Sequence, residues 1–159
     1  MEKERVSSDE ETLRRLMVEL RILEGTAEAL QARLNLVNAA LTELSFAKMT
    51  LEGVEKEKGE APLFVPIGGG SYVQAKLASS DKIILGIGAG VSVEKTVAEA
   101  KETVGSRFAD FEKTRATLQQ QLVQVVNRIQ EGREKFQELT AKMSEAERRA
   151  DVQETKRRP

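Results

Sequence analysis

One glycine-rich segment has the residue types of a phosphate-binding loop. Gly86-Ile87-Gly88-Ala89-Gly90 follows an apolar run and precedes a helical pattern, the setting in which backbone N–H groups bind phosphate. The spacing does not fit, because GxGxxG requires a third glycine where this sequence has Val91 or Val93. The Gly-Lys-Ser/Thr ending of a P-loop is also missing. We therefore interpret these glycines as turn residues.

The residue types of most catalytic sites are also missing. The sequence contains no histidine and no cysteine, which excludes imidazole proton transfer, thiol nucleophiles, disulfides and the usual zinc ligands. Neighbouring carboxylates such as Glu10 and Glu11, or Glu145 and Glu147, lie in charged segments without an apolar pocket to raise a pKa. We predict no enzyme activity, no cofactor and no metal site.

The composition indicates long helices interrupted by one unusual segment. Ala, Glu, Lys, Leu and Arg make up 80 of the 159 residues, a proportion typical of coiled coils. Residues 61–93 differ from both flanks, because they hold six of the 11 glycines and only three charged residues. With 40% hydrophobic residues and a net charge of -1, disorder is not expected.

The distribution of apolar and charged residues bears on the location of the protein and on nucleic-acid binding. The charged start of the chain leads into no apolar stretch, and no run approaches the roughly 18 apolar residues of a membrane span, so we expect a cytoplasmic protein without a membrane partner. The basic residues near the C-terminus alternate with acidic ones and have no aromatic neighbours, so we expect no nucleic acid partner.

Both flanks carry a heptad pattern, the repeat of apolar residues that forms the contact line of a coiled coil. From Leu13 to Leu51, 11 of 12 heptad positions are apolar, and Lys48 is the exception. From Val97 to Ala150, 13 of 16 are apolar, with Lys101, Arg115 and Gly132 as the exceptions. We predict helices over residues 9–58 and 94–152, with residues 1–8 and 153–159 as flexible tips.

The helix ends and the pairing of the arms follow from the same pattern. Ser8 or Asp9 is predicted to cap the first helix and Ser92 the second. An antiparallel hairpin of the two arms is favoured over parallel pairing with another chain, because the tether keeps the partner close. In that hairpin Leu13 to Leu23 is expected beside Phe136 to Ala150.

The central segment reads as two β-hairpins. Strands are predicted at residues 63–67 and 72–77 around a glycine-rich loop, and at 82–87 and 91–93 around Gly88 to Gly90. Isolated hairpins are marginal in water and their open edges pair with other chains, so we expect a sheet or barrel completed by other subunits. The predicted assembly residues are Leu63, Val65, Ile67, Val73, Leu77, Ile83, Leu85 and Ile87.

Helix, two hairpins, helix resembles the archaeal type of prefoldin alpha subunit. The resemblance is densest in Pro62 to Val73 (PLFVPIGGGSYV) and in Ile83 to Lys95 (IILGIGAGVSVEK). It implies an α+β fold, in which a long antiparallel two-helix coiled coil carries two hairpins that form a barrel with other subunits. It further implies a hexamer with two alpha and four beta subunits, which holds unfolded proteins without ATP and passes them to a group II chaperonin.

The free ends of the arms would then bind the unfolded clients. Met17, Val18 and Ile22 are apolar but lie off the heptad line, and flexible methionines suit promiscuous contacts. The predicted client-binding residues are Leu13, Leu16, Met17, Val18, Ile22, Leu139 and Met143. The alternative is that Met17 widens the heptad line at a flanking e position and that Val18 and Ile22 are scattered surface apolars. The chain would then be a structural coiled-coil spacer with one fixed partner.

Overall fold

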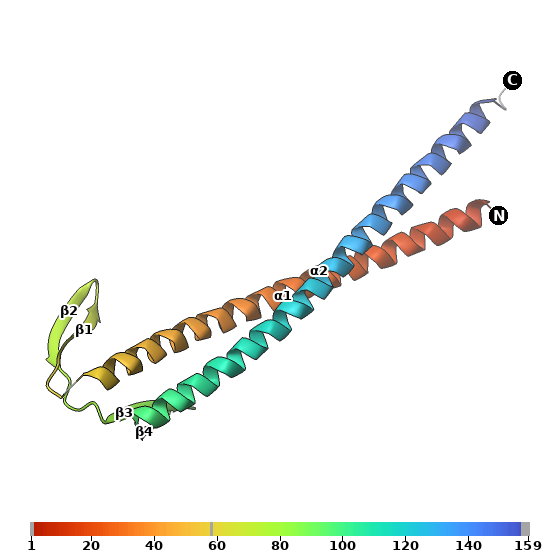
Figure 1. The fold of residues 1–159 in the computed structure, drawn as a ribbon. Helices are drawn as coiled ribbons and strands as arrows, with labels where there is room; N and C mark the ends of the chain where they lie inside the picture. The colour runs from red at the N-terminus through yellow and green to blue at the C-terminus, as the bar shows by residue number, and fades with distance from the viewer. Residues whose placement is uncertain (1, 58, 157–159) are drawn as a thin grey trace. The chain divides into compact units, whose positions relative to one another are not determined.

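The computed structural model describes residues 2–57 and 59–156 of the chain (Figure 1). The elements in chain order are α1 (Glu2–Lys56), β1 (Pro62–Gly68), β2 (Ser71–Lys76), β3 (Lys82–Gly88), β4 (Val91–Thr96) and α2 (Val97–Lys156). This order confirms the predicted fold class of two long helices with two β-hairpins. In the described part of the chain, no helix is long and apolar enough to cross a membrane.

The chain divides into two compact units. The helical unit contains residues 1–35 and 116–159, and the hairpin unit contains residues 36–115. Each unit therefore combines one part of α1 with one part of α2, and only the hairpin unit contains strands.

In the helical unit the two helices pack antiparallel, as predicted, but in a different register. A Cβ atom on Gly132 would lie 2.8 Å from Cδ2 of Leu20 and 3.9 Å from Cδ1 of Leu16. Leu16 and Leu20 therefore lie beside Gly132, so the predicted alignment of Leu13 to Leu23 with Phe136 to Ala150 is wrong. The sequence pattern repeats every seven residues, and such a repeat allows the helices to slide without losing apolar contacts.

In the hairpin unit the structure explains two of the exceptions to the heptad pattern, Lys48 and Lys101. Ala100 is completely buried and Ala47 is half-buried, so these alanines occupy the helix contact next to Lys101 and Lys48. The Nζ atom of Lys101 lies 2.7 Å from a carboxylate oxygen of Glu55. Burying an ammonium group is costly, so the helices turn the small apolar residue inward. Lys48 is left exposed, and the half-buried Lys101 keeps its ammonium paired with Glu55.

Each pair of strands forms its own two-stranded antiparallel sheet. In β1–β2, Val65 pairs with Val73 and the register shifts between Pro66 and Gly68. In β3–β4, Leu85 pairs with Val93 and the register shifts between Gly86 and Gly88. The first turn contains three glycines with positive φ, Gly68 to Gly70, a conformation that costs glycine little. Gly88 and Gly90 at the second turn also have positive φ, whereas Gly86 lies within β3 and pairs with Ser92; the prediction of turn glycines is therefore confirmed for Gly88 and Gly90 and wrong for Gly86.

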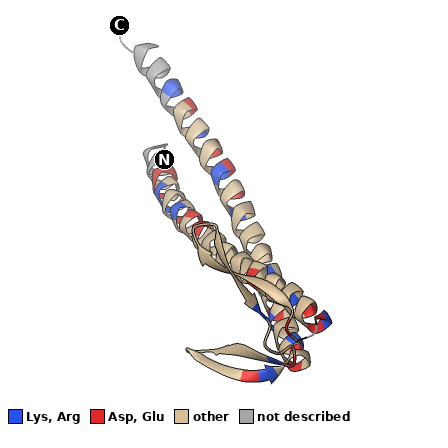
Figure 2. Ribbon diagram, turned by 90° about the vertical axis from the view of Figure 1, so that its left-hand side faces the viewer, with Lys and Arg blue, Asp and Glu red and all other residues tan. Residues whose placement is uncertain are grey.

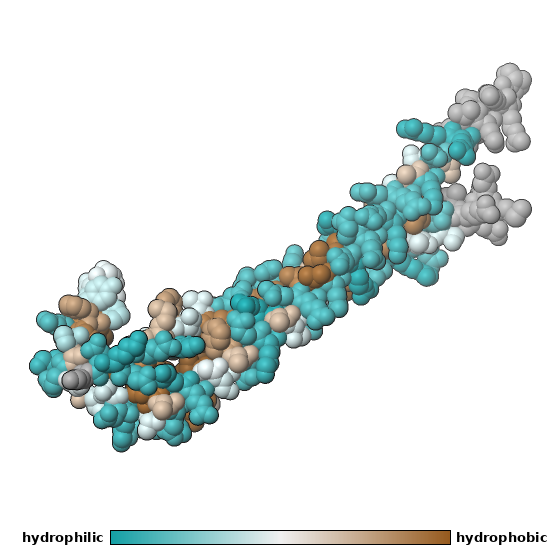
Figure 3. All heavy atoms as spheres, viewed as in Figure 1, coloured by the Kyte–Doolittle hydropathy of each residue, from teal (hydrophilic) through white to brown (hydrophobic). Residues whose placement is uncertain are grey.

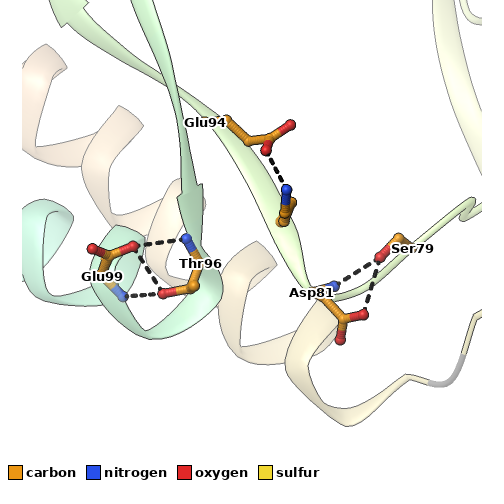
Figure 4. Close-up of polar contacts among 6 residues, drawn as sticks. Ser79, Asp81, Glu94, Thr96 and Glu99 are labelled. Atoms are coloured by element: carbon orange, nitrogen blue, oxygen red, sulfur yellow. Dashed lines mark hydrogen bonds and ion pairs between the residues drawn. The ribbon is translucent and has the colours of Figure 1, made fainter.

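The start of α2 differs from the prediction. β4 continues to Thr96, so Ser92 lies within a strand and the helix begins at Val97 rather than near residue 94. The backbone N–H of Glu99 donates to Thr96 Oγ1 at 3.2 Å, and the N–H of Thr96 donates to the Glu99 carboxylate at 3.0 Å (Figure 4). This reciprocal pair is a capping box, in which each side chain accepts from the other residue's backbone.

The outer helix ends also differ from the prediction. α1 begins at Glu2, not at a cap formed by Ser8 or Asp9, and it ends at Lys56; α2 extends to Lys156. Residues 2–8 and 153–156, which were predicted as flexible tips, are therefore helical. Met1, Lys58 and residues 157–159 lie outside the described residues. Charged residues continue the helical pattern without a stop signal, so composition did not mark these ends.

Replacing Thr96 with alanine is expected to lower the free energy of unfolding by about 0.5–2 kcal/mol, because the first turn of α2 loses its N-cap. Urea unfolding at a fixed chain concentration measures the change. The matched control is Thr114→Ala in the middle of α2, where the hydroxyl only donates to the carbonyl of Asp110 and alanine is the better helix former. Equal losses in both variants would contradict the role of the cap.

The capping box also predicts a pH dependence at this helix end. The backbone hydrogen bond from Thr96 is the main cause that holds the pKa of Glu99 below its ordinary value of about 4.5, and the Thr96 hydroxyl and Lys95 add to the effect. A carboxyl whose pKa is lowered by folding stabilises the fold above the unfolded pKa, and the stabilisation is lost as the pH falls through the lowered value. The protection factors of the amides in the first turn of α2, which compare the measured exchange with the intrinsic rate at each pH, should therefore decrease below pH 4.5.

Candidate functional site

The β3–β4 hairpin is attached to the helices by an apolar core. Leu51 of α1 packs with Ala100 and Val104 of α2, and Ile83 and Leu85 of β3 pack against this cluster. Arg107 donates a hydrogen bond from its guanidinium to the carbonyl of Gly86 at 2.9 Å. Two of the predicted assembly residues, Ile83 and Leu85, are thus half-buried within this chain, which positions the hairpin on the helices.

Both hairpins expose large apolar side chains on their strands. Among the predicted assembly residues, Leu63 and Leu77 are half-buried, and the following are exposed: Val65, Ile67, Val73 and Ile87. The backbone N–H of Leu77, just beyond β2, donates to the carbonyl of Ala61 and extends the strand pairing. The hairpins therefore present apolar surface that their own chain does not cover.

Four further exposed apolar residues on the strands were missed by the sequence analysis, one of them Val91 of β4 at 51%. Phe64 is 70% exposed, Tyr72 is 63% exposed and Ile84 is 79% exposed. The unbroken apolar runs Leu63 to Ile67 and Ile83 to Leu85 place apolar side chains on both faces of β1 and β3, because successive side chains of a strand point to opposite faces. These unbroken runs were the sequence feature that could have identified Phe64 and Ile84.

In the helical unit the predicted client-binding residues fall into two groups. Leu13, Leu16, Leu139 and Met143 are half-buried on the helix contact. Met17, Val18 and Ile22 are exposed, at 54%, 61% and 63%. Figure 3 shows hydrophobic residues reaching the surface among hydrophilic ones along the helices.

Two of the exposed residues line a groove, which we call the outer groove. It has a volume of about 650 Å³. Its walls are formed by Arg14, Arg15, Val18, Glu19, Ile22, Leu23 and Thr26 of α1 and by Val125 and Arg128 of α2. Val18 and Ile22 are one helical turn apart and therefore lie on the same face of α1. The structure thus brings these two together, and it leaves Met17 outside the groove lining.

Ion pairs join the two helices beside this groove. Arg128 pairs with Glu19 at 3.0 Å, and Arg133 pairs with Glu24 at 2.7 Å. The two glutamates are five residues apart, which is about 140° around a helix, so the pairs lie on opposite sides of the apolar contact. All four side chains are exposed, so each pair contributes little to stability but helps to define the register.

Charges alternate along the helices and are sparse on the strands (Figure 2). The pKa of Lys142 is raised mainly by its hydrogen bond to Glu138, with a smaller effect from the charge of Asp9. The effect of Asp9 on Lys142 agrees with the antiparallel register around Leu20 and Gly132. On the β3–β4 hairpin, Lys82 and Glu94 form a cross-strand pair at 2.6 Å (Figure 4).

The described residues contain no group of three or more acidic, histidine or cysteine side chains that could hold a metal ion. Each unit offers apolar contact surface: exposed strand residues in the hairpin unit, and the outer groove in the helical unit. Its chemistry is therefore that of reversible, largely apolar binding.

The family model described as prefoldin subunit matches residues 23–142. The prefoldin subunit alpha of Methanopyrus kandleri is 36% identical over 76% of this chain and 77% of its own length. That of Methanococcoides burtonii is 33% identical over 77% of this chain and 88% of its own length. That of Pyrococcus horikoshii is 29% identical over 87% of this chain and 95% of its own length.

A solved structure supports the fold independently. The cryo-EM structure of filamentous PFD from Methanocaldococcus jannaschii superposes with a TM-score of 0.62 and is 21% identical in sequence. The match covers 71% of this chain and 93% of that one. Two long helices joined by β-hairpins are therefore an architecture already observed in a solved structure.

Proposed function

Because the chain belongs to the prefoldin family of chaperones, we propose that it is an ATP-independent holdase subunit that captures unfolded proteins and delivers them to a group II chaperonin in the cytoplasm. The observation that carries the proposal is the exposure of Met17, Val18 and Ile22 in the helical unit. Exposed apolar side chains on an otherwise charged surface are what an unfolded chain binds. The proposal involves no nucleotide, and the glycine spacing of the chain fits neither GxGxxG nor a P-loop.

The energetics of the outer groove suit capture and release. Complete burial of a valine or isoleucine side chain contributes about 1.5–3 kcal/mol, and part of that offsets the cost of association. One groove would therefore bind with roughly millimolar affinity. Several grooves on one assembly would bind an unfolded chain more tightly through avidity, and the chain could leave one groove at a time without ATP hydrolysis.

The relatives of this chain are subunits, and assembly with other prefoldin subunits follows from the family. We propose that two copies combine with four beta subunits and that the exposed strand residues complete shared barrels. Phe64, Tyr72 and Ile84 join the predicted assembly residues in this role because each remains more than 60% exposed after folding. Native mass spectrometry of the chain mixed with a beta-type subunit measures the stoichiometry.

Suppression of aggregation tests the holdase function. The assembled complex, without nucleotide, is expected to keep a chemically denatured client protein from scattering light after dilution. Val18→Ser combined with Ile22→Ser should raise the concentration of complex that halves aggregation by about two- to fivefold. The groove loses two of its apolar lining residues, while the other subunits still bind the client.

The matched control is Val123→Ser combined with Val126→Ser, which removes two exposed valines that do not line the outer groove. It should leave suppression unchanged. An intact assembly that fails to suppress aggregation would overturn the holdase proposal. Binding to one native partner and to no unfolded protein would instead favour the structural spacer.

A further inference from the structure

The outer groove is apolar inside and basic at its edge. Three arginines line it, Arg14, Arg15 and Arg128, together with a single acidic residue, Glu19. Arg128 pairs with Glu19, and Arg15 pairs with Glu11. Among the described residues no ion pair involves Arg14, so its guanidinium is available to a ligand that enters the groove.

Arg14, Val18 and Ile22 form a row along α1. Residues four apart on a helix are neighbours with Cβ atoms about 5–6 Å apart, so the row places one cation and two apolar side chains in line. An extended peptide places every second side chain on one face, about 6.5–7 Å apart. A client segment with a carboxylate followed by two apolar residues at alternate positions therefore matches the row in order and approximately in spacing.

We propose that the outer groove selects unfolded segments in which apolar side chains follow a carboxylate, because Arg14 binds the carboxylate while Val18 and Ile22 bind the apolar side chains. This inference rests on the proposed holdase function and specifies the class of client. Guanidinium groups form charge-assisted hydrogen bonds with carboxylates, and a lysine or arginine at the same place in the client would be repelled. The groove thus selects by charge as well as by hydrophobicity.

Three fluorescent peptides that differ at one residue test the selection. They share two leucines at alternate positions, and the residue two places before the first leucine is Glu, Gln or Lys. Fluorescence anisotropy with the assembled complex should give the order Glu, Gln, Lys, with about three- to fivefold between neighbours at low salt, the size of an exposed ion pair. The difference should shrink as salt screens the charges.

Arg14→Gln should remove most of the preference for the glutamate peptide. Arg21→Gln is the matched control, because it makes the same charge change seven residues along α1 at a residue that does not line the groove. Equal affinities for the three peptides, or a preference that survives Arg14→Gln, would overturn the selection.

Aggregation suppression by the same preparation separates the two proposals. Suppression without a charge preference would leave the holdase function standing and remove the client class. Charge-selective peptide binding without suppression would remove the holdase function and support the groove as a binding site for acidic apolar segments. Loss of the preference in Arg21→Gln as well as in Arg14→Gln would show that net charge, rather than the groove, selects the peptide, and would overturn the inference.

Discussion

Replacing Leu51 with alanine is expected to lower the free energy of unfolding by about 2–4 kcal/mol. Leu51 is 6% exposed and packs with Ala100 and Val104, so shortening its side chain leaves a cavity where α1, α2 and β3 meet. Ile83 and Leu85 of β3 would lose the same partner, so the β3–β4 hairpin should also become less protected against amide exchange.

Urea unfolding followed by circular dichroism measures this loss, at one chain concentration because assembly contributes to stability. The matched control is Leu36→Ala, which shortens a leucine of the same helix that is 72% exposed. It should change the free energy of unfolding by less than about 0.5 kcal/mol. A similar effect of both substitutions would mean that the cluster around Leu51 is not a core.

Replacing Gly132 with leucine is expected to destabilise the helical unit by about 1–3 kcal/mol. A Cβ atom at this position already falls 2.8 Å from Cδ2 of Leu20, which is closer than van der Waals contact allows. A whole leucine side chain would push the helices apart at this contact, a penalty larger than the gain of about 1 kcal/mol from removing glycine in a helix. Amide exchange around Leu20 and Gly132 measures the local opening.

Two smaller substitutions check this reasoning. Gly25→Ala, on an exposed face of α1 with no atom near its Cβ position, should stabilise the chain by about 0.5–1 kcal/mol through helix propensity alone. Gly132→Ala should gain less than Gly25→Ala, because the Leu20 side chain has to move. Equal gains would show that Gly132 does not mark a close helix contact.

Periodicity predicted the helices and the alternation of charge well, but it could not identify every inward residue. The heptad pattern, which alternates steps of four and three residues, assigns Lys101 to the helix contact, whereas the structure buries the neighbouring Ala100. The choice between adjacent residues depends on how two helices rotate about their axes, and that depends on the partner surface. The antiparallel register was missed for the same reason, since only the fit of Leu20 against Gly132 distinguishes it from its neighbours.

The tip residues illustrate a second limit. Met17, Val18 and Ile22 lie off the heptad line, and all three are exposed in the structure. The sequence did not predict that Val18 and Ile22 share a groove with Arg14, because Val125 and Arg128 of the other helix form its second wall. A groove between two helices exists only once their register is set.

The amino-acid sequence by itself determined the order of elements, the turns at the glycines and the lack of thiol and imidazole chemistry. These depend on local propensity and on residue type, which neighbouring residues in the chain express directly. Only the tertiary structure decided that Ile83 and Leu85 serve the chain's own core and that a basic edge borders the apolar groove. Each of these requires two segments to meet, and side-chain packing selects that meeting from several that the sequence pattern allows.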